Sequence, residues 1–282
     1  MLNLFEAIWR YSYLQHAYFA GILIACISPI FGVFVVSKRA SLIPDTIGHV
    51  SFSASTFTVL LISLGLLPTT FSPVYMVMLF AVLTAFIISY INSEFPQSKE
   101  VALSFVMTFS LGSAIVMYQL SRIKTDLSAY LFGNIVALTR MDVLLIIVIF
   151  ILALLFMLRY YRILLITTFD TVFAKTKGIS AKKIDTLFFI ILALIIASST
   201  KFVGVLLVSA LMNLPVMIVM PFTKSFNQTI IWSIIIGEIT MLSGLIISYY
   251  LVLPASGVVA MILGLLFLCV LILRTIPKFK YE

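Results

Sequence analysis

The segment from Val143 to Leu158, VLLIIVIFILALLFML, contains no polar side chain. A helix that spans a lipid bilayer needs about 20 predominantly apolar residues, and it must satisfy its own backbone hydrogen bonds because water is absent there. With its flanking residues, this segment predicts a transmembrane helix and thereby decides the class of the protein.

Similar apolar runs lie on either side of this segment. They occur at Leu14–Val36, Ile47–Leu67, Phe71–Ile91, Val101–Leu120, Thr186–Thr200, Phe202–Pro221, Ile230–Leu253 and Gly257–Leu273. The run at Thr186–Thr200 is short. We therefore expect an all-α integral membrane protein in which residues 1–282 form a single bundle of eight or nine transmembrane helices.

The composition excludes a water-soluble protein. Of the 282 residues, 63% are hydrophobic and 10% are charged, whereas soluble domains average about 45–50% and about 25%. The formal net charge of +8 comes from short basic clusters between apolar runs, which form no basic face of the kind that binds nucleic acid. Cys26 and Cys269 lie far apart in apolar segments and predict neither a disulfide nor a thiolate metal site.

The longest polar interruption is the segment 159–185, in which basic residues outnumber acidic ones. Loops rich in lysine and arginine stay on the cytoplasmic side, so we expect this segment to be cytoplasmic. The N-terminus would then be external if nine runs cross the membrane and internal if eight do.

Within this loop, residues 168–180 are expected to form a short helix, a stop at Gly178 in the left-handed conformation, and a second helix with Ser180 as its N-cap. Phe169 and Phe173 would lie near the surface of the first helix. Such a helical pair can dock into a cleft on another protein, or it can rest on lipid headgroups.

Two acidic residues are exceptions to the placement of acids in loops, tails and span ends: Asp45 opens the second apolar run and Glu238 lies in the middle of the eighth. A charge at the centre of a bilayer costs about 2.5–3.5 kcal/mol, so such residues usually face a cavity or a partner. His49 follows Asp45 at i+4, which places both side chains on one helical face with Cβ atoms about 5–6 Å apart. A carboxylate and an imidazole at that spacing can bind one divalent transition metal. The alternative is that Asp45 caps a helix and His49 hydrogen-bonds to a neighbouring helix.

Three other residues are candidates for a transport pathway. Glu238 can line a cation path or accept a proton, or it can hydrogen-bond in a helix contact. Met212 offers a soft thioether ligand, although methionine in apolar helices is more commonly a packing residue. Pro215 would kink its helix and free a backbone carbonyl group, which is tolerated where a cavity is lined.

Enzymatic chemistry has no visible basis in the sequence. It lacks the G-x-x-x-x-G-K-[ST] phosphate-binding loop and the H-E-x-x-H zinc motif. The chain is therefore predicted to be neither an ATPase of that type nor a metalloprotease.

From about Leu14 to Leu273, the chain resembles the membrane permeases of the bacterial ABC-type zinc, manganese and iron importers. The most specific stretch is 39–51, RASLIPDTIGHVS, which matches the family pattern R-x-x-S-L-x-x-D-x-x-x-H. Further similarity lies in Asp126–Asn134, in the pattern formed by Asp170, Ala174 and Gly178, in Val203–Pro215 and in Gly244–Tyr250.

This resemblance implies an importer subunit in the bacterial cytoplasmic membrane, in contact with membrane lipid. The partners it implies are a second permease copy, two cytoplasmic ATPase subunits and an extracellular metal-binding lipoprotein. It implies that Asp45 and His49 contribute to a site for the transported metal, with no permanently bound cofactor. It also implies that the segment from Asp170 to Gly178, flanked by Phe169, couples the permease to the ATPase.

The stretch around Asp45 is more similar to the zinc branch of the family, so we favour zinc as cargo, with manganese or iron as the alternative. Relatives usually have Y-x-D-x-P where this chain has Tyr250–Pro254, YLVLP, so no role for an acid there carries over. Thr171 and Val172 replace acids that relatives often have in the coupling segment. A secondary carrier driven by an ion gradient, with Glu238 as its proton site, is the rival hypothesis.

Overall fold

The computed structural model describes residues 10–95, 97–121, 123, 132–133 and 138–275. In these residues the structure is helical and without strands, which confirms the predicted all-α class. Eight helices are long and apolar enough to span a membrane: α2 (Ser12–Ser37), α3 (Leu42–Ser63), α4 (Pro73–Glu94), α5 (Lys99–Leu120), α7 (Arg140–Phe169), α9 (Ala181–Val219), α10 (Phe226–Leu251) and α11 (Ala255–Thr275). The described residues also contain two short helices, α8 (Thr171–Thr176) and η2 (Met220–Phe222).

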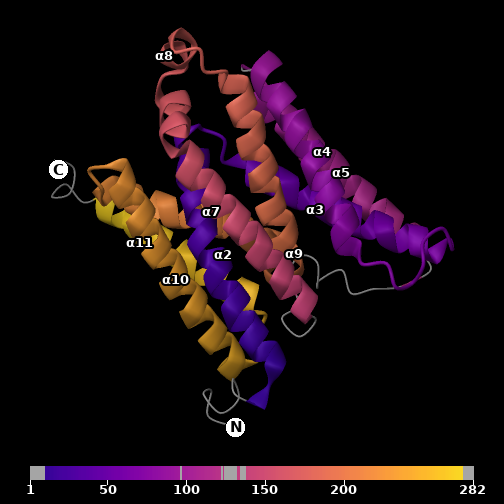
Figure 1. The fold of residues 1–282 in the computed structure, drawn as a ribbon. Helices are drawn as coiled ribbons and strands as arrows, with labels where there is room; N and C mark the ends of the chain where they lie inside the picture. Colours follow the sequence, from indigo (N-terminus) through magenta and orange to yellow (C-terminus); the bar gives the residue numbers. More distant parts are fainter. Residues whose placement is uncertain (1–9, 96, 122, 124–131, 134–137, 276–282) are drawn as a thin grey trace.

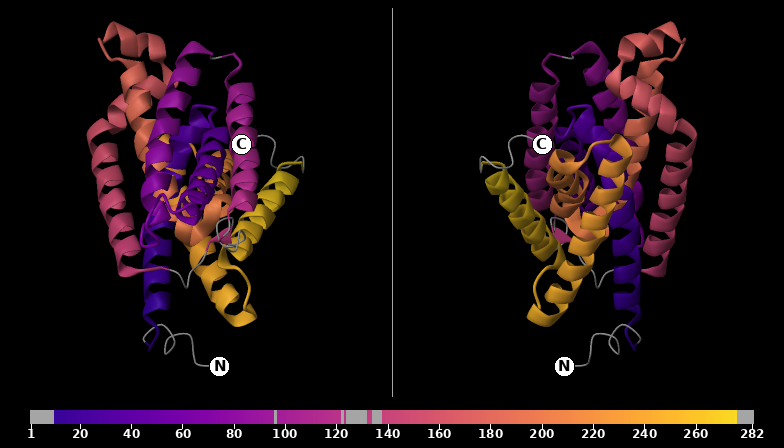
Figure 2. Two further views of the ribbon diagram at one scale, coloured as in Figure 1. Left: turned by 90° about the vertical axis from the view of Figure 1, so that its right-hand side faces the viewer. Right: turned by 90° about the vertical axis from the view of Figure 1, so that its left-hand side faces the viewer.

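The central helix of the bundle is α9. It packs against α2, α3, α4, α7, α10 and α11, and Figures 1 and 2 show it between the group α3–α5 and the remaining helices. Most of its side chains are buried, including Leu192, Ile195 and Ile196. A helix that is apolar on all its faces is expected at such a position.

Helix α9 consists of two limbs, because the chain turns back at Gly204. The backbone angles of Gly204 are φ 76° and ψ 163°, which are not helical. Phe188, before the turn, stacks on Phe31 at 5.3 Å between ring centroids, and Met212, after the turn, contacts the neighbouring Gly32 through its carbonyl oxygen. A straight helix would separate residues 188 and 212 by about 36 Å, so the limbs 181–203 and 205–219 run back along each other.

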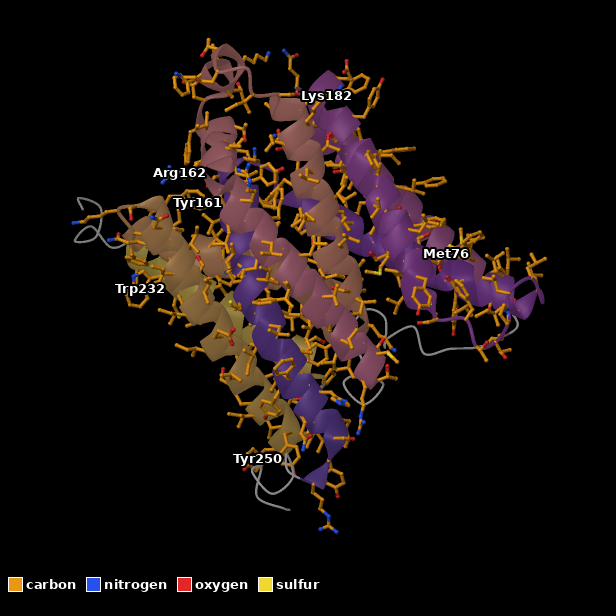
Figure 3. All side chains as sticks on the ribbon, viewed as in Figure 1. Met76, Tyr161, Arg162, Lys182, Trp232 and Tyr250 are labelled. Carbon is orange, nitrogen blue, oxygen red and sulfur yellow. The ribbon has the colours of Figure 1, made fainter. Side chains whose placement is uncertain are left out.

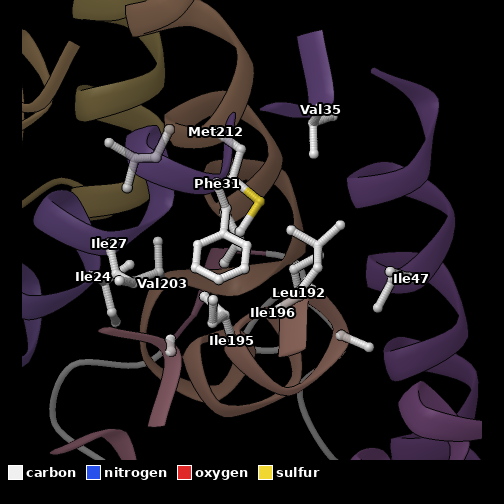
Figure 4. Close-up of a cluster of buried hydrophobic side chains, with 14 of the residues drawn as sticks. Ile24, Ile27, Phe31, Val35, Ile47, Leu192, Ile195, Ile196, Val203 and Met212 are labelled. Carbon is white, nitrogen blue, oxygen red and sulfur yellow. The ribbon is translucent and has the colours of Figure 1, made fainter. Parts of the chain in front are cut away.

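The two limbs correspond to the two runs that we expected as separate spans. The turn is at Gly204 rather than at Lys201, where the sequence predicts the break. Figure 4 shows the result in the core, where Leu192 and Ile196 of the first limb and Met212 of the second limb gather around Phe31 of α2.

The bundle has two distinct ends. Helix α8 lies at one end and the beginning of α2 at the other (Figure 1), and Figure 3 places Lys182 near the α8 end and Tyr250 at the opposite end. If the α8 end is cytoplasmic, as the basic segment predicts, then α2 begins on the external side. This is the orientation expected for nine apolar runs.

The polar loop between α7 and α9 is shorter than the predicted segment 159–185. Helix α7 continues to Phe169 and α9 begins at Ala181, so the loop comprises residues 170–180 and contains α8. The sequence boundaries were wrong because arginines such as Arg159 and Arg162 end an apolar run but, as good helix formers, do not end the helix.

Candidate functional site

The candidate metal site begins at the tight turn between α2 and α3. The backbone N–H of Ala40 donates to the carbonyl of Val35, and Arg39 adopts the left-handed conformation with φ 53°. This turn ends α2 and starts α3 after Ser41. Pro44 lies in the first turn of α3, where its missing N–H costs no helical hydrogen bond.

Asp45 and His49 lie on one face of α3, as the i, i+4 spacing predicts. Asp45 is in the first turn of the helix, at the positive end of the helix dipole. Both side chains are half-buried. The Nδ1 atom of His49 is buried and has no hydrogen-bond partner among the described residues, which leaves this polar atom available for a ligand.

The second limb of α9 packs closely against this part of α3. A Cβ atom added to Gly48 would lie 2.5 Å from Cγ1 of Val205, so only glycine permits this approach. Phe52, one turn beyond Gly48, packs in a small buried cluster with Val205 and with Ala114 of α5. The Asp45–His49 pair therefore lies on a part of α3 that is enclosed by α5 and α9.

Asn213, which our sequence analysis did not identify, also belongs to this region. Its side-chain Nδ2 donates to the backbone carbonyl of Ser41, at 3.1 Å, and its Oδ1 atom is buried without a hydrogen-bond partner among the described residues. The only signal in the sequence is an amide residue inside the apolar run Phe202–Pro221. Its contact with Ser41 spans most of the chain and is not visible in local spacing.

One chain supplies an incomplete set of metal ligands. Among the described residues, no cluster of three or more histidine, cysteine, aspartate or glutamate side chains is arranged to hold a metal ion. A carboxylate and an imidazole are too few for a closed structural site. The remaining ligands would be water, other polar atoms or a second copy of the chain.

The other predicted pathway residues lie elsewhere. Glu238 is half-buried on α10, beside Gly237, which packs against the backbone of Ala25 in α2. Helix α10 packs mainly against α2, α9 and α11, whereas α3 packs mainly against α4, α5 and α9. The structure thus places Glu238 and the Asp45–His49 pair on helices that share only α9 as a main neighbour among the described elements.

Met212 and Pro215 lie in the second limb of α9. Both are buried, and Met212 is completely inaccessible to solvent. Figure 4 shows the Met212 side chain beside Phe31 in the apolar core. This position fits the packing role of methionine.

The predicted helix–glycine–helix segment is present at the α8 end. Asp170 caps α8, its Oδ1 accepting a hydrogen bond from the backbone N–H of Phe173 at 2.8 Å. Gly178 ends the turn with φ 72°, and the N–H of Ile179 donates to the carbonyl of Ala174. The helix differs from the prediction in that Phe169 belongs to the end of α7.

Helix α8 and Phe169, the last residue of α7, present apolar side chains outward. Phe169 is 69% exposed, Val172 71% and Phe173 45%, whereas Ala174 is fully buried. Phe169 is also in ring contact with Phe226 at the start of α10, at 5.8 Å between centroids, and Phe226 contacts Phe34 of α2 at 4.9 Å. The exposed segment is therefore connected to two spanning helices by a row of aromatic rings.

Comparison with known proteins gives a consistent assignment. The profile of the ABC 3 transport family matches residues 10–274. The motif Asp126–Asn134 lies within that range but, except for Phe132 and Gly133, outside the described residues.

Two curated relatives span nearly the whole chain. The chain is 28% identical over 250 residues to the high-affinity zinc uptake system membrane protein ZnuB of Buchnera aphidicola, covering 88% of this chain and 93% of that protein. It is 27% identical over 265 residues to the manganese transport system membrane protein MntC of Halalkalibacterium halodurans, covering 93% and 88%.

A solved structure, PsaBC from Streptococcus pneumoniae in complex with Fab, superposes with a TM-score of 0.81 at 25% sequence identity. The superposition covers 98% of this chain and 96% of that one.

Proposed function

The chain belongs to the ABC 3 transport family, and we propose that it is the permease subunit of an ATP-driven importer of divalent metal. It is a multi-pass membrane protein of a family of metal transporters. In this proposal it lies in the bacterial cytoplasmic membrane and performs no chemistry on its cargo, while ATP is hydrolysed by a separate chain. Its partners are a second permease copy, two cytoplasmic ATPase subunits and an extracellular metal-binding lipoprotein.

The observation that carries this proposal is the Asp45–His49 pair on α3, in which the buried Nδ1 of His49 has no hydrogen-bond partner within the described part of the chain. A carboxylate and an imidazole bind zinc and manganese alike. Because two protein ligands leave the metal incompletely coordinated, the site can release its cargo. The exposed side chains of Phe169 at the end of α7, and of Val172 and Phe173 on α8, would receive the force of ATPase closure.

Zinc is the cargo that we favour, since the stretch around Asp45 is more similar to the zinc branch of the family. Manganese is the second candidate, because the curated relatives include proteins named for manganese transport. Uptake of radioactive zinc and manganese by cells that lack their other importers separates the two.

The site assignment is tested by Asp45→Ala and His49→Ala in the complete transporter. We expect each substitution to abolish uptake while the permease remains in the membrane and still co-purifies with its ATPase. Thr46→Ala is the matched control, because Thr46 lies between the two residues but donates its hydroxyl proton within the helix, to the carbonyl of Leu42. Metal uptake that survives both substitutions would refute the assignment.

The rival hypothesis, a carrier driven by an ion gradient, predicts transport without an ATPase. The chain alone is reconstituted in vesicles, and metal flux is measured under a proton gradient. Flux that is lost on Glu238→Gln would favour the carrier, whereas flux that requires the ATPase and ATP would favour the importer.

A further inference from the structure

We propose that Asn213 supplies a third ligand atom, its amide oxygen Oδ1, to the cargo held by Asp45 and His49. The proposal rests on the proposed function as a metal importer and concerns the selectivity of that same site. It starts from the orientation of the Asn213 side chain. The carbonyl of Ser41 can only accept a hydrogen bond, so the amide nitrogen of Asn213 must face it, at 3.1 Å. The Oδ1 atom is therefore turned away from that carbonyl.

Ser41 fixes the place of Asn213 relative to the Asp45–His49 pair. Ser41, Asp45 and His49 follow one another at intervals of four residues, so they form one stripe along α3. Ser41 is the N-cap residue of α3, so its carbonyl group lies at the start of that helix, one turn before Asp45. Because Asn213 donates to the carbonyl of Ser41, its amide lies at the Asp45 end of the stripe.

Two buried atoms of this region have no hydrogen-bond partner among the described residues, Nδ1 of His49 and Oδ1 of Asn213. Buried polar atoms are nearly always paired, so each such exception needs an explanation. Imidazole nitrogens and amide oxygens are both ligands of divalent cations. A cation on Asp45, with its bound water, would provide both atoms with a partner.

An amide oxygen has a specific consequence for selectivity. Carboxylate, carbonyl and water oxygens suit manganese, whereas zinc is bound well by nitrogen and carboxylate ligands in small numbers. Asn213 would therefore support manganese more than zinc, and its removal would shift the transporter toward zinc. This makes Asn213 a specificity-determining residue.

The test compares Asn213→Ala with Asn213→Asp in the complete transporter, with zinc and manganese uptake measured in parallel per amount of permease in the membrane. Ala removes both the donor to Ser41 and the oxygen, whereas Asp removes the donor but retains an oxygen. We expect Asn213→Ala to lower manganese uptake about tenfold, the usual scale for the loss of one group from a metal site, with a much smaller loss for zinc. Asn213→Asp should retain manganese uptake.

Ser209→Ala is the control in the same limb, because the hydroxyl of Ser209 donates only to the carbonyl of Leu206, one turn earlier. It should change neither uptake nor selectivity. If Asn213→Ala does not assemble, Asn213→Ser replaces it. Binding of Mn²⁺ to the purified complex, followed by electron paramagnetic resonance, adds a measurement that does not depend on transport.

The proposal is overturned if Asn213→Ala lowers zinc and manganese uptake in equal proportion, since Asn213 would then only tether α9 to α3. It is also overturned if Asn213→Asp behaves like Asn213→Ala, or if neither changes the ratio. Failure of the proposed function is a different result, because Asp45→Ala would then leave metal uptake intact.

Discussion

The ammonium group of Lys201 lies 2.6 Å from Oδ2 of Asp142, which joins the turn of α9 to the first turn of α7. The same carboxylate oxygen accepts hydrogen bonds from the backbone N–H and the hydroxyl of Thr139 in a capping box. Lys201 precedes Gly204 by three residues. The ion pair thus stabilises the region in which α9 reverses its direction.

We expect Lys201→Met to destabilise the purified permease by about 1–2 kcal/mol, because the Asp142 carboxylate is only 14% exposed and loses a charged hydrogen-bond partner. A drop in the thermal unfolding midpoint measures this effect. Lys182→Met is the control, since its ion pair with Glu94 is about half exposed and should contribute little. Equal midpoints for the two variants would contradict the prediction.

Gly204→Ala tests the turn itself. The region at φ 76° and ψ 163° is open essentially to glycine alone, and forcing another residue into it costs about 1–3 kcal/mol. We expect less folded protein and a lower unfolding midpoint, both followed by size-exclusion chromatography of a fluorescent fusion. Gly112→Ala on α5 meets open space and should be neutral or slightly stabilising.

Gly32→Ala tests the contact between α2 and the second limb of α9. A Cβ atom at this position would overlap the carbonyl oxygen of Met212, which is backbone and cannot move aside alone. Overpacking of this kind costs about 1–3 kcal/mol or more, so we expect a strong loss of folded permease. Gly264→Ala on α11, where no atom lies within reach of a new Cβ, is the matched substitution. Similar yields of the two variants would refute the contact.

Asp170→Ala tests the link between α8 and ATP hydrolysis. The substitution removes the N-cap of a six-residue helix, at a cost of about 1 kcal/mol, and should loosen α8 without affecting the spanning helices. In vesicles that contain the complete transporter, we expect more ATP to be hydrolysed per metal ion imported. Asp170→Ser retains a capping oxygen and should restore the wild-type ratio. Unchanged coupling in the alanine variant would show that the cap has no part in it.

The sequence was sufficient to predict the class of the fold and the position of most spanning helices, because each has its own apolar run. It also predicted the shared face of Asp45 and His49 and the left-handed stop at Gly178, which depend on residues close together in the chain. The exact position of the turn in α9, at Gly204 rather than at Lys201, and the contact between Asn213 and Ser41 were missed. Both depend on packing between segments that are distant in sequence, and no local pattern reports such packing.

Near α8, the residues at which helices begin and end were predicted less well than the existence of the helices. Arg159 and Arg162 end the apolar run of α7, but its backbone stays helical to Phe169, because arginine is a good helix former. Glu238 shows the opposite limitation. Its charge in an apolar run suggests a function. Whether it lies near Asp45 and His49, however, depends on which helices pack together, and the sequence does not report this.

The row of rings formed by Phe169, Phe226 and Phe34 has a mechanical consequence. Close-packed side chains have little room to absorb displacement, so a push on α8 would be passed to α2 with little loss. Because Gly32 brings the backbone of α2 against the carbonyl of Met212, a displacement of α2 would also displace the second limb of α9. Asn213 lies in that limb and donates to the carbonyl of Ser41 at the start of α3, so a displacement of α8 would reach the helix that bears Asp45 and His49.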